Sequence, residues 1–375
     1  MAGEKTSRGR HRISATVMSK DTPLFEVVTN EEGEVITTGK VFDEARLPVC
    51  LLRGRVNAEN VRKWLLSREV PVEEEGLPAR FSVTDPYWVR YRTDETWEDG
   101  NFFENAYQAD PGRTSFGIWK SDRRWVQPHA PEGDRLSWLI KAGSYVPRRD
   151  PFLEVIASRM VAEMNVVPCV TYELCAGALK FCSKRRNFAD ADTEFVPASF
   201  LYGLEERGSS ETRFRHMVRM CERLNVPDAE GWLLRMTAAD MVTGNAGRTF
   251  KNFGFLREVA TGRILGPAPL MDLMGAFSFD DDKRTGLFPE EEERALRFAK
   301  TCGMRTPDAG PLLELVEGWP MFSLEKKRFV CRQMLAGVRK TWSCKSITRS
   351  FLARFPGRTV KRHVGTDRET DEGTG

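Results

Sequence analysis

The sequence lacks the patterns that most directly indicate a metal centre, a disulfide scaffold or a membrane protein. Its eight cysteines are scattered without a C-x-x-C pair, and the four histidines do not flank them at metal-ligand spacing. We therefore expect reduced, partly buried thiols. The chain has no run of about 18 apolar residues, and its N-terminus is basic without the apolar core of a secretory signal. These absences favour a cytoplasmic protein without membrane contact.

Net charge is also nearly absent. The 57 Lys and Arg residues exceed the 54 Asp and Glu residues by 3, and the first fifteen residues alone account for that excess. The rest of the chain is neutral overall and lacks the net basic footprint of a nucleic-acid-binding protein. We therefore expect contact with nucleic acid to be indirect, if it occurs at all.

The chain contains enough hydrophobic residues to form sizeable cores. Its length of 375 residues allows two or three domains at about 150 residues each, and 41% of the residues are hydrophobic. The pattern predicts an α+β protein with a β-rich N-terminal part and a helical C-terminal part. We expect five segments: a disordered basic arm (1–12), a β-rich subdomain (13–110), a second β-containing unit (111–197), a helical lobe (198–343) and a mostly disordered tail (344–375).

A strand followed by a helix is predicted near the middle of the chain. Residues 137–142 (SWLIKA) alternate, so Lys141 shares one strand face with Leu139. Asp150 and Pro151 then supply an N-cap and a proline at the first helical position. The helix that they predict, over residues 151–164, carries Glu154 in its first turn.

The second half alternates between helices and a hairpin. Residues 166–174 and 178–183 predict a β-hairpin, and helical stretches are expected near 211–224 and 229–242. Asp240 lies on the apolar stripe of the second stretch, which predicts a half-buried carboxylate. A polar loop (243–252) precedes one strand from Phe253 and another that begins at Ile264 and ends at Asp272. Helices are expected from Gly286 to about Ser343.

Four side chains in this order fit the needs of phosphoryl transfer, which are a cation on the phosphates and oxygen ligands for Mg²⁺. Lys141 on a strand and Glu154 on the next helix form a candidate ion pair. Asn252 after the loop and Asp272 after the hairpin could converge on a metal ion. Each residue alone is usually structural, but their order matches the order of parts in protein kinases.

The blocks that hold these residues resemble the HipA-like protein kinases in their bacterial branch. They are WLIKAGS (138–144), DPFLEVIASRM (150–160), GNAGRTFKNFGF (244–255) and APLMDLMGAF (268–277). The resemblance runs from about Asp21 to Trp342. It implies a two-lobed kinase-like fold in which residues 111–197 form the N-terminal lobe and the nucleotide lies in the cleft between the lobes.

The resemblance also assigns roles. It implies that Lys141 contacts the phosphates of ATP, that Glu154 pairs with Lys141, and that Asn252 and Asp272 bind Mg²⁺. Further assignments complete the nucleotide site: a phosphate-covering loop at 114–120 with Ser115 and Gly117 as backbone donors, and residues 182–184 near the adenine hinge.

The chain departs from the family pattern at the catalytic position. That pattern runs Asn, any residue, Asp, Arg, His, two residues, Asn; here Arg248 and Asn252 match it, whereas Gly247 replaces the catalytic Asp and Thr249 replaces the His. Glycine cannot accept a proton, and a missing base costs ~10²–10⁴ in rate. Asp240 lies two helical turns earlier, which favours an anchoring role over that of a substitute base.

Three functions therefore stay open. The first is a HipA-like kinase that transfers phosphate from Mg-ATP to a protein Ser or Thr hydroxyl. The second is a pseudokinase that binds nucleotide as a conformational ligand, because the catalytic Asp is missing. The third is a toxin–antitoxin or mobile-element regulator associated with DNA. A protein substrate or an antitoxin-like partner fits these functions, while the phosphoacceptor and the oligomeric state stay undetermined.

Overall fold

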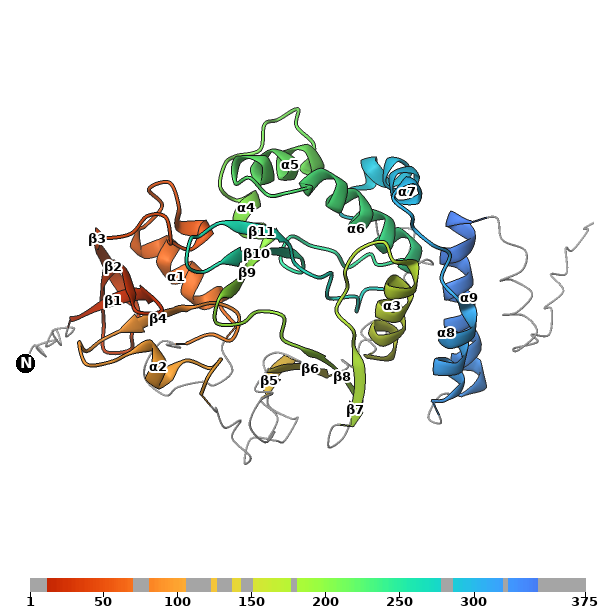
Figure 1. The fold of residues 1–375 in the computed structure, drawn as a ribbon, viewed down its shortest axis with the longest axis horizontal. Coiled ribbons are helices and arrows are strands. Elements are labelled where there is room, and N and C mark those ends of the chain that lie inside the picture. Colours follow the sequence, from red (N-terminus) through yellow and green to blue (C-terminus); the bar gives the residue numbers. More distant parts are fainter. Residues whose placement is uncertain are drawn as a thin grey trace, which may run out of the picture.

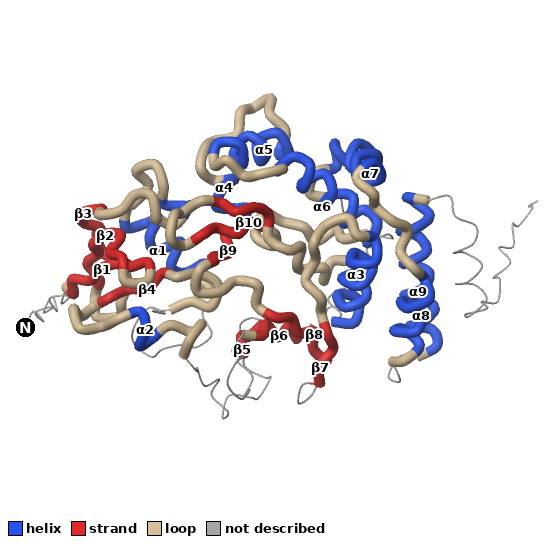
Figure 2. Tube along the Cα trace, in the orientation of Figure 1, coloured by secondary structure: helices blue, strands red, loops and turns tan. Residues whose placement is uncertain are grey.

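Strands dominate the first half of the chain and helices the second (Figures 1 and 2), which confirms the predicted α+β class. The computed structural model describes residues 12–69, 81–105, 123–126, 137–142, 151–176, 181–277, 286–319 and 323–342. The predicted arm and tail therefore lie almost entirely outside the described residues. Among the described ranges, no helix is both long and apolar enough to cross a membrane.

The N-terminal unit is a four-stranded antiparallel sheet covered by a helix. Its strands are ordered β3 (Val35–Val41), β2 (Thr22–Thr29), β1 (Ile13–Ser19) and β4 (Tyr87–Arg90). Asn57 caps the N-terminus of helix α1 (Ala58–Ser67), and its side chain accepts a hydrogen bond from the Asn60 amide. Val61 and Trp64 on α1 pack with strand residues such as Phe25, which closes a small separate core.

The central sheet carries the predicted lysine. Its order is β5 (Arg123–Val126), β6 (Trp138–Ala142), β8 (Phe181–Arg186) and β7 (Glu173–Ala176), all antiparallel. Alternation along β6 buries Leu139 and Lys141 and leaves Trp138 and Ile140 half-buried. The predicted face of Lys141 is therefore the inner one.

Helix α3 (Pro151–Met164) packs against this sheet and is buried along most of its length. It begins at Pro151, as the sequence predicts, because proline suits the first helical position. The proposed N-cap, Asp150, lies outside the described residues. The first hairpin strand was predicted over 166–174, but β7 begins only at Glu173, and only an isolated bridge from Cys169 to Leu270 precedes it.

The third sheet joins the strand-rich part to the helices. It consists of β11 (Ile264–Pro267), β10 (Gly254–Glu258) and β9 (Thr193–Pro197). The predicted second strand was expected to reach Asp272, but β11 ends at Pro267. Pro267 and Pro269 lack the N–H groups that a ladder needs, so the chain continues to Asp272 as irregular backbone.

Helices complete the C-terminal part. After β9 they are α4 (Ala198–Tyr202), α5 (Arg213–Arg223), α6 (Ala229–Thr243), α7 (Glu292–Thr301), α8 (Ala309–Glu317) and α9 (Leu324–Thr341), with a 3-10 turn at Pro289–Glu291. The N-terminal unit contains the short α2 (Trp97–Gly100) and a 3-10 turn at Val49–Leu51. Helix α6 is buried on all sides and packs against both α7 and α9. It therefore forms the centre of the helical part (Figure 1).

A buried ion pair joins the N-terminal unit to the third sheet. The Arg257 guanidinium of β10 lies 2.9 Å from the Glu194 carboxylate of β9, and it donates to the Tyr87 hydroxyl of β4 at 3.1 Å. Arg257 also donates to the Leu47 carbonyl at 2.8 Å. Because these groups are buried, the N-terminal unit is held in a fixed position against the rest of the chain.

Candidate functional site

Lys141 lies between two carboxylates. Its Nζ is 2.7 Å from Glu154 Oε1 on α3 and 3.1 Å from Asp272 Oδ1 after β11. Lys141 is 3% exposed and Glu154 is fully buried, whereas the Asp272 side chain keeps 29% of its surface accessible. The structure thus brings together three of the four residues on which the phosphoryl-transfer hypothesis depends.

Tyr172 is a further member of this cluster. Its hydroxyl accepts hydrogen bonds from Lys141 Nζ at 3.4 Å and from the Asp272 amide at 3.0 Å. Burial, followed by the nearby Glu154 charge, raises the pKa of Tyr172 to about 12. Tyr172 is therefore a neutral phenol at neutral pH, and it fixes the backbone at Asp272 while touching the ammonium.

Electrostatics keep Lys141 charged. Burial opposes the charged form, but Glu154, Tyr172 and Asp272 outweigh burial and raise the pKa of Lys141 above its ordinary value. The Ser183 hydroxyl on β8 donates to the other oxygen of Glu154 at 2.6 Å. Lys141 and Ser183 are directly paired across β6 and β8, so the sheet register sets the position of the whole cluster.

Asp272 occupies a strained backbone position. Its φ is +57°, a left-handed conformation that residues other than glycine rarely adopt. Such strain is retained where surrounding contacts over-determine it, and it is frequent at functional sites. Here the Tyr172 hydroxyl and the Lys141 ammonium hold the residue in this conformation.

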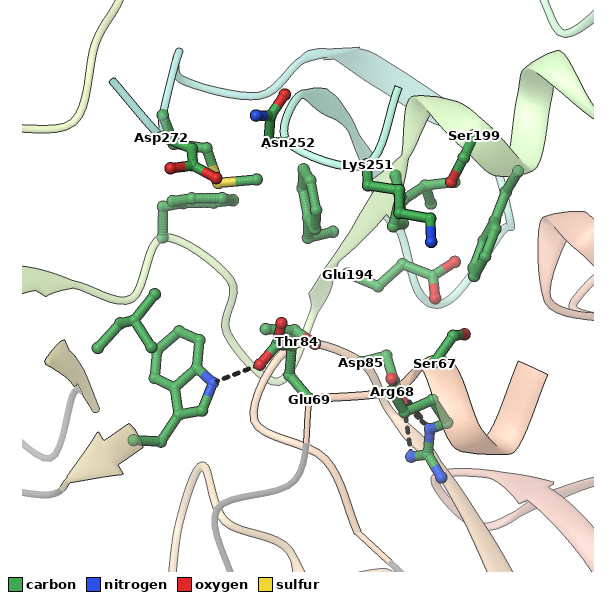
Figure 3. A pocket seen from close by; sticks show the side chains of 18 of the residues that line it. Ser67, Arg68, Glu69, Thr84, Asp85, Glu194, Ser199, Lys251, Asn252 and Asp272 are labelled. Carbon is green, nitrogen blue, oxygen red and sulfur yellow. Dashed lines mark hydrogen bonds and ion pairs between the residues drawn. The ribbon is translucent and has the colours of Figure 1, made fainter. Parts of the chain in front are cut away.

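A cavity of about 340 Å³ adjoins the cluster, within the range of small-ligand sites. Lys141, Asn252 and Asp272 line one end of it. Figure 3 shows Asn252 and Asp272 at that end, with Arg68 and Asp85 of the N-terminal unit across the cavity. The N-terminal unit therefore supplies part of the wall.

The loop after α6 is organised by a buried ion pair. Both oxygens of Asp240 accept from the Arg248 guanidinium at 2.8 Å, and the Asn245 side chain donates to Oδ1 at 2.8 Å. Asp240 is 8% exposed, so it is buried rather than half-buried, and side chains rather than backbone amides are its main partners. Arg248 also donates to the Met271 carbonyl at 2.6 Å, which ties the loop to the residue before Asp272.

Asn252 stabilises the same loop from its other end. Its side chain donates to the Gly247 carbonyl at 3.0 Å and accepts from the Thr249 amide at 2.8 Å. An amide oxygen has two lone pairs, so one stays available for a metal ion. Within the described ranges, no three His, Cys, Asp or Glu side chains converge as a metal cluster. Two protein oxygens with phosphate oxygens and water are, however, a common Mg²⁺ arrangement.

Gly247 lies against the backbone of the opposite segment. A Cβ added to Gly247 would lie 3.2 Å from the Gly275 Cα, and one added to Gly275 would lie 2.7 Å from the Gly247 nitrogen. Of the predicted site residues that the structure describes, Glu154, Gly247 and Arg248 are absent from the lining of the cavity. The place of the missing base is thus occupied by close backbone packing.

The remaining predictions concern the phosphate-covering loop and the segment 182–184. Ser115 and Gly117 lie outside the described residues. In the segment 182–184, Ser183 faces Glu154, whereas Lys184 lies 3.2 Å from Glu173 and above the Trp138 ring. This segment therefore supports the cluster from β8.

Sequence reasoning missed four residues that shape the site. Tyr172 and Gly275 have no local signal, because their contacts lie far away in the sequence. Arg185 continues the face of Ser183 along β8, and Lys251, the neighbour of Asn252, also lines the cavity. The period-two alternation on β8 could have indicated Arg185. The position of Lys251 directly before Asn252 could have indicated Lys251.

Comparison with known proteins yields similarity of structure alone. No family model matches the chain, and no curated protein matches its sequence. The chain is similar to the proinflammatory kinase CtkA of Helicobacter pylori, with a TM-score of 0.47 and 14% identity over 60% of this chain and 90% of that one. It is also similar to the Shewanella oneidensis toxin–antitoxin complex of HipA, HipB and operator DNA, with a TM-score of 0.37, 14% identity and 66% of each chain covered. Both scores are below 0.5, so neither likeness bears on the function.

Proposed function

We propose that this chain binds Mg-ATP in the cavity beside Lys141 and is a HipA-like kinase-type protein that transfers phosphate to a protein hydroxyl. The observation that carries the proposal is the buried lysine between two carboxylates, with Lys141 2.7 Å from Glu154 and 3.1 Å from Asp272. A lysine that serves only to pair a carboxylate needs one partner. Here the Asp272 side chain keeps 29% of its surface accessible and lines the cavity, which suits a metal-binding carboxylate.

The residues fit the implied ligands. Asp272 and Asn252 offer a carboxylate and an amide oxygen at one end of the cavity, and these are ligand types that Mg²⁺ prefers. When bound, the ion would neutralise charge on the phosphate oxygens. The Lys141 ammonium would contribute a second positive charge there, held in place by Glu154.

A specific observation favours a pseudokinase as the second candidate. Gly247 offers no carboxylate to orient an acceptor hydroxyl, and its Cα packs against Gly275. In that case nucleotide would be retained as a conformational ligand while transfer would be lost. The two candidates share the nucleotide site and differ only in the fate of the γ-phosphate.

Calorimetric titration with ATP, with and without Mg²⁺, tests the shared site. We expect binding that requires Mg²⁺, and a loss of at least about tenfold in affinity in Lys141→Met. Lys63→Met is the matched control, because Lys63 is exposed on α1 and is absent from the described lining of the cavity. Unchanged affinity in a folded Lys141→Met would overturn the site.

Radiolabelled ATP then separates the two candidates. Transfer of label to the protein itself or to an added protein substrate supports the kinase. Mg²⁺-dependent binding without transfer supports the pseudokinase.

A further inference from the structure

Arg185 is a buried cation at the wall of the cavity. It lies on β8, directly opposite Leu139 on β6, and two residues along from Ser183. Side chains two residues apart on a strand share a face, so Arg185 is on the same inner face as the Lys141 cluster. The residue is 4% exposed and lines the cavity together with Leu139 and Met271.

The hydrogen-bonding capacity of this guanidinium is largely unused. Nη1 donates to the Arg186 carbonyl at 3.0 Å, Nη2 has only the Met271 sulfur at 3.7 Å, and the buried Nε has no partner. In the described part of the chain, no carboxylate pairs with Arg185. A buried polar group without a partner destabilises the protein, so a ligand that satisfies it gains affinity.

The other buried guanidinium groups provide a contrast. Each has a carboxylate within 2.9 Å, in the pairs Arg68–Asp85, Arg248–Asp240 and Arg257–Glu194. Arg185 therefore differs from the arginines that serve packing and loop structure. Arg185 has no such carboxylate partner among the described residues, and it lines the cavity.

Aromatic rings hold the Arg185 plane in position. The guanidinium carbon lies 5.3 Å from the Trp125 ring centroid and 4.8 Å from that of Phe188. Stacked arginines of this kind keep a fixed orientation and present the edge of the fork. The edge formed by Nε and Nη2 is the side that binds two acceptors at once, and here a single thioether is its only described partner.

We propose that Arg185 contacts the bound nucleotide and that its Nε/Nη2 edge takes a pair of acceptor atoms. Two sources in a nucleotide supply such a pair: two oxygens of one phosphate group, and N7 with O6 of guanine. Adenine offers N7 beside the N6 donor, so it satisfies only one donor of the edge. The inference rests on the proposed nucleotide site and adds a residue that recognises the ligand there.

Binding of three probes tests this contact. Mg-GTP, Mg-ATP and Mg-tripolyphosphate are titrated calorimetrically into the full chain and into Arg185→Met, Arg185→Lys and the control Arg297→Met. Arg297 is exposed on α7 and is absent from the described cavity lining. Arg185→Lys keeps the charge but loses the fork, and Arg185→Met removes an unpaired charge, so both variants are expected to fold.

We expect both Arg185 variants to lose at least about tenfold in affinity while Arg297→Met binds as the wild type does. A loss confined to GTP identifies the guanine edge as the acceptor pair, and an equal loss for all three probes identifies a phosphate. Unchanged affinities for all probes overturn the proposal, as does a loss confined to ATP. If the wild-type chain binds none of the probes, the nucleotide site itself fails, a result distinct from an Arg185 variant that binds normally.

Discussion

Gly247 and Gly275 approach so closely that a Cβ built on Gly275 would lie 2.8 Å from the Gly247 Cα. The two glycines belong to the loop after α6 and to the segment after Asp272, and the Ala246 amide donates to the Gly275 carbonyl at 3.3 Å. This backbone contact joins the two segments that carry Asn252 and Asp272, the two candidate metal ligands. The geometry of the site therefore depends on the absence of a side chain at Gly275.

Gly275→Ala is expected to separate the two segments. The new methyl group would meet backbone atoms of Gly247 at 2.7 Å, and backbone cannot move aside as a flexible side chain does. We expect a loss of about 1–3 kcal/mol in the free energy of unfolding and weaker Mg-nucleotide binding, measured by denaturant titration and calorimetry. Gly208→Ala is the control, since its nearest neighbour is at an ordinary 3.7 Å. Wild-type stability in Gly275→Ala would contradict the close packing.

The Gly247→Asp variant tests whether a carboxylate at this position restores phosphate transfer. A Cβ at Gly247 would lie 3.2 Å from the Gly275 Cα, so the loop must shift by a few tenths of an ångström to admit it. A positioned base contributes ~10²–10⁴ in rate, so we expect faster label transfer from radiolabelled ATP than in the wild type. Gly247→Ala has the same Cβ without the carboxylate and should gain nothing. If the two variants transfer alike, the base position has been lost together with the residue.

Local sequence patterns predicted the parts of the site that local structure determines. The alternation of SWLIKA predicted that Lys141 shares a strand face with Leu139, and the Asp-Pro start placed Glu154 in the first turn of its helix. Both predictions depend on neighbouring residues only. The register of β6 against β8 then brings Ser183 to the Lys141–Glu154 pair.

Long-range contacts could not be predicted in this way. Tyr172 and Asp272 are a hundred residues apart, and the hydrogen bond between them depends on how the segment before β7 meets the segment after β11. The prediction that the strand from Ile264 reaches Asp272 was wrong, because two prolines end the ladder. The irregular backbone that follows is what allows Asp272 its left-handed conformation.

A substitution at Asp240 tests whether nucleotide binding depends on the loop after α6. Asp240→Asn leaves the fully buried Arg248 side chain without a charged partner, and breaking a buried ion pair on one side costs ~3–5 kcal/mol. We expect a lower melting temperature and weaker Mg-ATP binding, because Arg248 also holds the carbonyls of Asn252 and Met271. Lys63→Met, which breaks an exposed pair on α1, should change neither. Normal nucleotide affinity in Asp240→Asn would show that the loop is dispensable.

We expect part of the loss of folding stability at low pH to arise from Glu211, which lies next to α5. Hydrogen bonds from Arg219 at 2.9 and 3.0 Å, which outweigh partial burial, lower the pKa of Glu211 from its ordinary 4.5 to about 2. A carboxyl group whose folded-state pKa is lowered stabilises the protein fully above its unfolded value and loses that contribution as pH falls through the folded value. Thermal unfolding followed between pH 5 and pH 2 should therefore show a decline that is shallower in Glu211→Gln, which cannot ionise. Glu31→Gln, at an exposed position, should retain the wild-type slope. A Glu211→Gln profile as steep as that of the wild type would contradict a stabilising role for this ion pair.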